Sequence, residues 1–212
     1  MIVKNPSVPN LIEPKMVDLA LLEIQAKLIS ELTWLDNAFG KAHIINDGVP
    51  QVYVGGPVGE DYLSLFPDSH LGNFCFFDFI DGETIDKFGK KSGEFEREFS
   101  LIFWFDFTKV YGASSYIRTV ENVKQDVLEI LGLTGFRNST VRFHKFYERV
   151  ANVYKGYDSN KIKKEAYMRP YGCFRLEGSI KYFEANRCNL STLSDQLGIN
   201  YMKVGESFVI KS

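Results

Sequence analysis

The sequence predicts an α+β fold, in which an antiparallel sheet of hairpin-joined strands is packed by two helices on one face. Two segments repeat apolar residues every three or four positions, which is the period of a helix. Several shorter segments alternate or are apolar throughout, which is typical of strands. Their order along the chain is helix, strands, helix, strands. A length of 212 residues fits one such domain with extensions.

The chain divides into three parts. Residues 1–13 are expected to form an extended arm, because three prolines in the first fourteen residues oppose a helix. Residues 14–185 contain all the strongly periodic segments and form the predicted domain. Residues 186–212 are expected to be an appendage, with a short helix near Leu190–Leu197 and a strand pair around Gly205.

Two helices are predicted. The first spans Lys15–Phe39, and Gly40 is expected to cap its C-terminus. Its apolar residues cover more than one stripe, so we expect it to be covered on more than one side. The second spans about Thr119–Leu131 and is expected to stop at Gly132. The main apolar stripe of the first helix consists of Val17, Leu21, Ile24, Leu28, Leu32 and Leu35.

Six segments are predicted to be strands: Ala42–Ile45, Gln51–Val54, Asn73–Ile80, Glu96–Thr108, Thr140–Tyr154 and Tyr171–Glu184. The last of them alternates between apolar residues such as Phe174 and Leu176 and polar ones such as Arg175 and Glu177. Two long connections, Asp81–Phe95 and Lys155–Met168, exceed the usual length of a hairpin loop. Long loops in a compact domain are usually functional or disordered, and two of them in one small domain point to a functional role.

The composition favours packing and assembly over catalysis. The chain has 18 Phe, 11 Tyr and 2 Trp, but only three Cys and three His. A net charge of −2 argues against a dedicated nucleic-acid-binding protein. Three cysteines without metal-ligand spacing are expected to be ordinary thiols in a reducing compartment. No signal peptide and no membrane span is predicted.

The motif search predicts no cofactor and no metal. The glycine-rich stretch Gly55–Gly59 lacks the spacing of a dinucleotide-binding loop, and no helix is expected after it. The three histidines are far apart in the sequence. A small cytosolic enzyme stays open as an alternative, because sites assembled across strands leave no local motif. Its candidate residues are His144, Asp78 and Glu148.

A second alternative is a binding module. The segment Lys155–Lys164 is the most basic stretch of the chain, and Tyr154 and Tyr157 lie beside its lysines. Positive charge combined with aromatic stacking would suit nucleic acid, and charge alone would suit an acidic protein. Asp158 and Glu165 dilute the charge of this region.

Apolar residues in segments expected to be exposed indicate assembly with other chains. They occur in the arm and in both long connections, where the second connection also carries basic residues. The predicted interface residues are Ile2, Val3, Val8, Leu11, Ile12, Ile85, Phe88, Lys161, Ile162, Lys163 and Lys164.

The order of elements resembles a known group of proteins. A long N-terminal helix, a hairpin with an elongated loop, a second helix near Thr119 and a strand pair ending in Phe174–Phe183 resemble the tail-terminator and neck-ring proteins of tailed bacteriophages. The aromatic-rich, motif-poor character also resembles structural proteins of crAss-like phages. The resemblance covers roughly residues 15–184.

The resemblance implies a structural virion protein without enzymatic activity. Such proteins form homo-oligomeric rings at the head–tail junction, between the portal or connector and the tail. On this basis the expected partners are neighbouring copies, adjacent neck, portal and tail proteins, and passing double-stranded DNA bound without sequence specificity, with no membrane. The expected location is the virion, assembled in the host bacterial cytoplasm. The arm and the appendage depart from the usually shorter family pattern.

Overall fold

The structure is a computed structural model that describes residues 15–44, 48–53, 62–67, 71–79, 82–88, 92–133, 135–137, 139–185, 201–204 and 207–210. An α+β fold is confirmed, with strands and helices in broadly the predicted order. The main helices are α1 (Val17–Glu31) and α3 (Val120–Leu133). The main sheet contains β1 (Asn37–Lys41), β5 (Phe74–Phe79), β6 (Thr84–Phe88), β7 (Ser92–Asp106), β8 (Ser139–Tyr147) and β9 (Tyr171–Ala185).

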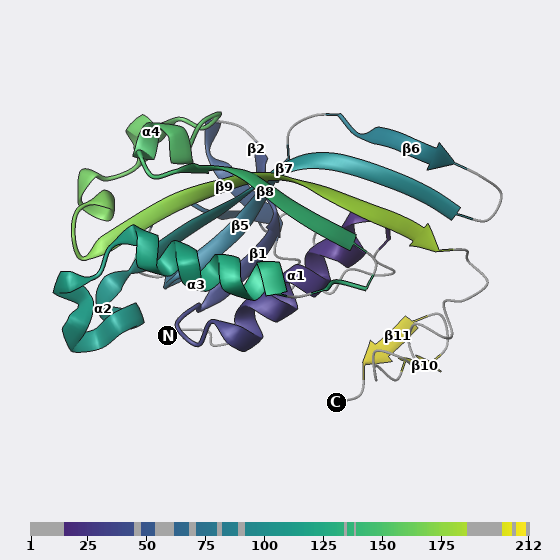
Figure 1. The fold of residues 1–212 in the computed structure, drawn as a ribbon, viewed down its shortest axis with the longest axis horizontal. Coiled ribbons are helices and arrows are strands. Elements are labelled where there is room, and N and C mark those ends of the chain that lie inside the picture. The colour runs from purple at the N-terminus through teal and green to yellow at the C-terminus, as the bar shows by residue number, and fades with distance from the viewer. Residues whose placement is uncertain are drawn as a thin grey trace.

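Two long strands form the centre of this sheet (Figure 1). The strands β7 and β9 pair antiparallel along fifteen residues each, from Ser92 opposite Ala185 to Asp106 opposite Tyr171. The strand order is β1-β5-β7-β9-β8, and β6 pairs with the first part of β7. All these pairs are antiparallel except β1 with β5. The strands β5, β6 and β8 therefore pair directly with the β7–β9 ladder, and β1 joins the sheet through β5.

The first face of the sheet is covered by α1 and α3, which both lie below the strands in Figure 1. Odd-numbered residues of β7, such as Leu101 and Phe103, point to this face and are fully buried. They pack with Ile24 and Leu28 of α1 and Val127 of α3. The period of the strand thus places its aromatic side chains against the apolar stripes of both helices.

The opposite face is covered by the chain between β8 and β9 and by a small sheet. The covering chain contains α4 (Val150–Val153), η4 (Ser159–Lys161) and η5 (Lys164–Tyr167), and α4 lies above the strands in Figure 1. The small sheet contains β2 (His43–Ile44), β3 (Pro50–Tyr53) and β4 (Tyr62–Ser64). A second core therefore forms here around Trp104, whose indole Nε1 donates to the carbonyl of Ala166 at 2.7 Å.

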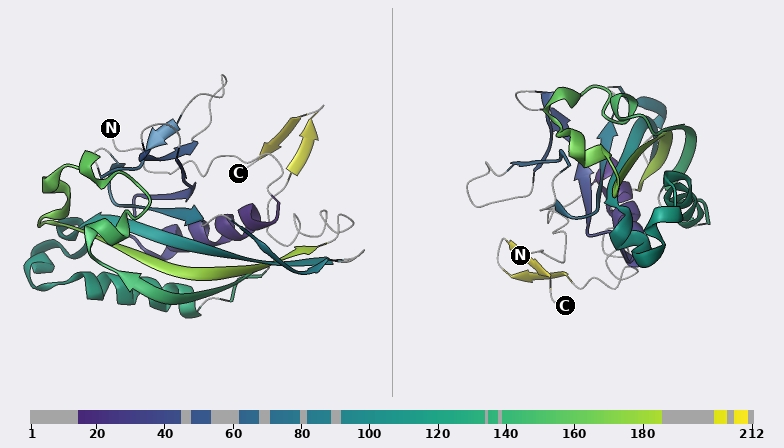
Figure 2. Two further views of the ribbon diagram at one scale, coloured as in Figure 1. Left: turned by 90° about the horizontal axis from the view of Figure 1, so that it is seen from above. Right: turned by 90° about the vertical axis from the view of Figure 1, so that its left-hand side faces the viewer.

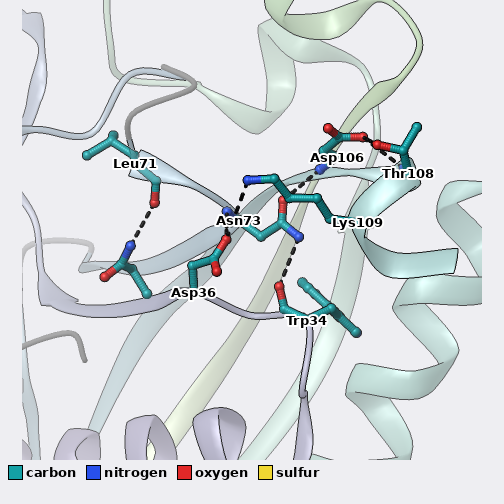
Figure 3. Close-up of polar contacts among 8 residues, drawn as sticks. Trp34, Asp36, Leu71, Asn73, Asp106, Thr108 and Lys109 are labelled. Carbon is teal, nitrogen blue, oxygen red and sulfur yellow. Dashed lines mark hydrogen bonds and ion pairs between the residues drawn. The ribbon is translucent and has the colours of Figure 1, made fainter. Parts of the chain in front are cut away.

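The first predicted helix is too long. It ends at Glu31, and residues 37–41 form β1, so Gly40 lies in a strand and is not a helix cap. The change of direction is fixed by Asn73, which is fully buried (Figure 3). Its carbonyl accepts from the amides of Asp36 and Asn37, while its amide donates to Asp36 Oδ2 at 2.8 Å. These contacts connect the chain entering β1 to the start of β5.

The side chain of Asn73 extends the same cluster to two further segments (Figure 3). Its Nδ2 donates to the carbonyl of Trp34 at 2.9 Å, and its Oδ1 accepts from the amide of Asp106 at 2.8 Å. Asp106 in turn caps α2 (Phe107–Tyr111) by accepting from the amide of Thr108. One buried amide therefore aligns the end of β7 with the start of β5.

Three further boundaries differ from the prediction. The strand expected to continue to Tyr154 ends at Tyr147, and α4 follows. The strand expected to end at Thr108 ends at Asp106, and Gly132 lies inside α3. In place of the expected loop Asp81–Phe95, the described part contains β6 and the first residues of β7, paired as a hairpin.

The predicted terminal segments are only partly described. The strands β10 (Tyr201–Val204) and β11 (Ser207–Ile210) pair antiparallel, as expected around Gly205. The arm of residues 1–13 and the helix expected near Leu190–Leu197 lie outside the described residues.

A glycine substitution tests the pairing of the edge strand β8. A Cβ at Gly178 would collide with the backbone carbonyl oxygen of Arg142, opposite an irregularity in β8. We expect Gly178→Ala to lower the free energy of unfolding by about 1–3 kcal/mol, because backbone must move to make room. Gly132→Ala is the matched control, since a Cβ there meets no atom and helix propensity favours alanine by about 1 kcal/mol. Urea unfolding measures both, and equal stability of the two variants would contradict the close approach.

Candidate functional site

A charged cluster lies on the second face of the sheet. The strand register aligns Asp78 of β5, Ser100 of β7, Glu177 of β9 and Lys145 of β8 in one row across four strands. Arg175, two residues before Glu177, points to the same face. We call these five residues the charged cluster. It adjoins the second hydrophobic core.

Arg175 is the centre of the charged cluster and its side chain is 4% exposed. Its Nη2 lies 3.1 Å from Asp78 Oδ2, and its Nε lies 3.4 Å from Glu177 Oε1. On its other side, Nη1 donates to the carbonyls of Val153 at 3.4 Å and Lys155 at 3.2 Å. One guanidinium therefore joins two strands to the covering segment after β8.

The carboxyl of Asp78 is held in competing environments. Burial raises its pKa, while the Arg175 guanidinium and the hydroxyl of Tyr157 oppose this rise. Burial and the nearby Asp78 carboxylate also raise the pKa of Tyr157. The pKa of Asp78 is higher in the folded protein than its ordinary 3.8. The contribution of this carboxyl to the free energy of unfolding therefore falls as the pH rises from 3.8 through its pKa in the folded state.

These contacts give the charged cluster a fastening role. The Arg175 guanidinium forms ion pairs with two carboxylates and donates hydrogen bonds to two backbone carbonyls, so it is directed to the protein itself. The sequence pattern predicted that Arg175 and Glu177 share the polar face of a strand, but not their burial. The one sign of a buried charge in the sequence was Asp78, an aspartate within the phenylalanine-rich segment 74–79.

The three residues considered for an enzyme do not converge. His144 lies at the irregularity in β8 and is exposed, with its Nε2 3.7 Å from Glu98 Oε2. Asp78 is on β5, three strand spacings away, which corresponds to about 14 Å. Glu148 follows β8 and lines a pocket described below. His144 and Asp78 are therefore too far apart to act on the same atom of a substrate.

The segment between β8 and β9 is not the loose loop that the sequence indicated. Lys161, Lys163 and Lys164 are exposed, but Ile162 is 5% exposed and packs in the second core. The expectation that Ile162 faces a partner is therefore wrong. Tyr154 and Tyr157 are also buried, so neither ring is available for stacking on a base.

A pocket lies where α2, the start of α3, the chain after β8 and the start of β9 meet. Its apolar wall is formed by Phe107, Val120, Val150, Tyr167, Tyr171 and Cys173. Glu148 and Arg169 line it with charged groups, and Arg169 is anchored to the carbonyl of Arg118 at 2.8 Å. Burial raises the pKa of the Cys173 thiol to about 12, with a further rise from Glu148. The thiol is thus held in its neutral form, and the pocket suits an apolar or aromatic group. No sequence motif indicated this pocket.

Exposed apolar side chains border this pocket. Tyr116 and Ile117 of η3 (Gly112–Ile117) are 76% and 64% exposed, and Met168 is 65% exposed. Thr119, two residues after Ile117, lines the pocket, as do both sequence neighbours of Met168. We call Tyr116, Ile117 and Met168 the pocket rim.

Among the predicted interface residues, Ile85 on β6 is 60% exposed, as expected. The side chain of Phe88 and the arm residues Ile2, Val3, Val8, Leu11 and Ile12 lie outside the described part of the chain. Phe183 on β9, 46% exposed, was not predicted. It stands opposite Glu94 in the β7–β9 ladder, near the same end as Ile85.

The described residues show neither a group of metal ligands nor a membrane-spanning helix. Within the described residues, no three His, Cys, Asp or Glu side chains are grouped in a way that could hold a metal ion. None of the described helices has the length and apolar character needed to cross a bilayer. Comparison with known protein families finds no matching family model, and comparison with curated proteins finds no match.

Replacement of Arg175 tests the fastening role. We expect Arg175→Met to lower the free energy of unfolding by about 3–5 kcal/mol, because Asp78 and Glu177 both lose the buried guanidinium that pairs with them. It should also raise the pKa of Asp78 further, since the opposing positive charge is gone.

Arg142→Met on the exposed edge strand is the matched control, with an expected change within about 0.5 kcal/mol. Urea unfolding gives the free energies, and carboxyl ¹³C NMR gives the pKa of Asp78. An unchanged pKa in Arg175→Met would contradict the proposed pairing.

Proposed function

We propose that this chain is a structural, non-enzymatic assembly subunit that forms a homo-oligomeric ring. The observation that carries the proposal is the exposure of large apolar side chains at two opposite ends of an elongated molecule. The pocket rim lies by η3 and the start of β9, while Ile85 and Phe183 lie by β6 and the end of β9 (Figure 1). The fifteen residues of β9 separate these ends by roughly 45 Å.

Two different contact sites on one molecule favour head-to-tail association. Such heterologous contacts make closed rings when the rotation between neighbouring subunits closes, and helical filaments when it does not. A site that contacted itself would stop at a dimer. The position of the exposed side chains at opposite ends therefore supports a ring or filament over a simple dimer.

The place of this ring is proposed from the sequence resemblance. We propose the neck of a tailed bacteriophage, between portal or connector and tail, as the ring's location, with neighbouring rings as partners and the virion as its place of residence. The order α1, β5–β7, α3, β8–β9 is compatible with that resemblance. The charged cluster supports the non-enzymatic part of the proposal, because its buried charged groups, Arg175 and Glu177, stabilise the fold.

The oligomeric state of the full chain tests the ring. Multi-angle light scattering of the purified protein should give a mass of several copies, and negative-stain microscopy should show closed rings. Mass spectrometry of purified phage particles should detect the chain. A monomer at all concentrations would contradict the ring, and absence from particles would contradict the neck alone.

A second candidate function is contact with nucleic acid at the pocket end. Residues 106–119 and 148–170 carry eight basic and four acidic residues, although the whole chain has a net charge of −2. Exposed lysines of this kind attract phosphate groups without reading sequence. A ring subunit could thus face passing double-stranded DNA with this end.

Charge removal tests the nucleic-acid contact. The triple substitution Lys161→Ala, Lys163→Ala and Lys164→Ala should weaken double-stranded DNA binding and reduce its salt dependence, because fewer counterions are released. A matched control is Lys15→Ala with Lys27→Ala and Arg142→Ala, which are exposed or partly exposed on α1, just before it and on β8. Fluorescence anisotropy at several salt concentrations measures both. Equal binding by the two triple variants would exclude a specific role of this segment.

A further inference from the structure

The pocket at the basic end is shaped for a protein side chain. Three aromatic rings, Phe107, Tyr167 and Tyr171, contribute to its wall. The pocket rim, whose residues lie next to or near lining residues in the sequence, adds a further aromatic and two aliphatic exposed side chains. A concave apolar site enclosed by exposed apolar groups is the usual form of an interaction hot spot.

The surface around this pocket is positively charged. Arg118 and Arg169 lie beside the pocket rim, and the exposed Lys163 and Lys164 belong to the same segment of chain. Glu148 and Glu165 are the exposed acidic residues here. A partner of this site should therefore combine an apolar side chain with surrounding acidic groups.

The opposite end of the same molecule has that combination. Phe183 is exposed near the end of β9, while Ile85 on β6 is exposed at the same end but in register with Phe95, on the other face of the sheet. Residues 81–98 and 181–185 carry seven acidic and five basic residues. Lys181 is itself paired with Asp86 at 2.8 Å and Glu94 at 2.5 Å. The sequence of this end therefore has a small excess of acidic over basic residues.

We propose that the pocket receives Phe183 from the acidic end of a second copy of this chain. This inference rests on the proposed ring and specifies its contact. The aromatic side chain fills the apolar wall, while acidic groups around it meet the basic surface of the neighbour. Each copy offers one pocket and one Phe183, so the contact repeats from copy to copy.

Two single substitutions test the contact from its two sides. Phe183→Asp removes the inserted ring, and Ile117→Asp places a charge on the pocket rim. Both side chains are exposed, so folding should be unchanged, which circular dichroism and thermal unfolding verify. Each variant alone should lose the ring, with association weakened about tenfold or more. Ile44→Asp, exposed on β2 away from both ends, is the matched control and should assemble normally.

Mixing the two variants gives the decisive result. Ile117→Asp keeps its acidic end and Phe183→Asp keeps its pocket, so an equimolar mixture should form dimers and nothing larger, as measured by mass photometry. If either variant alone still forms rings, the proposed contact is wrong while the ring itself stands. If the wild-type chain is monomeric, the proposed ring fails as well. A mixture that stays monomeric would also contradict the pairing of these two ends.

Discussion

The antiparallel ladder between β7 and β9 is the constraint on which the rest of the structure depends. Its fifteen residues on each strand run without a shift in register, so the buried odd residues of β7 from Phe95 to Phe105 reach the helical face, and Ile102 and Trp104 reach the other. β5, β6 and β8 pair with one of these two strands. The ladder also sets the long axis, because β6 and the far end of β9 lie at one end of the ribbon and α2 lies at the other (Figures 1 and 2).

The two faces of the sheet are stabilised differently. On the first face, burial of aromatic side chains against two apolar helices is sufficient. On the second face, the chain after β8 has only short helical turns, and the Arg175 guanidinium fastens it to Asp78 and Glu177. The fastened segment contributes Val150 and Tyr167 to one side of the pocket. The charged cluster thus supports the proposed contact site from within.

Periodicity predicted β9 and α3 closely, because both have strong apolar patterns and polar opposite sides. It failed at Leu32–Gly40, where the apolar pattern continues but the chain turns at Asp36 through contacts with Asn73, 37 residues later. It also failed at Ile162 and Tyr157, since a long connection rich in lysine gives no sign that its apolar residues fold back onto the sheet. Ile85 could be predicted as exposed, whereas the pocket depends on five separate segments meeting at one end.

The central claim is that copies of this chain associate through two different ends. Hydrogen–deuterium exchange of the wild-type protein at increasing concentration tests it most directly, because it reports on both ends in one sample. The account predicts that amides of residues 112–119 and 164–171 gain protection together with those of residues 84–88 and 180–185. Protection confined to one end would indicate a self-complementary contact. Protection of neither end would contradict association through these surfaces.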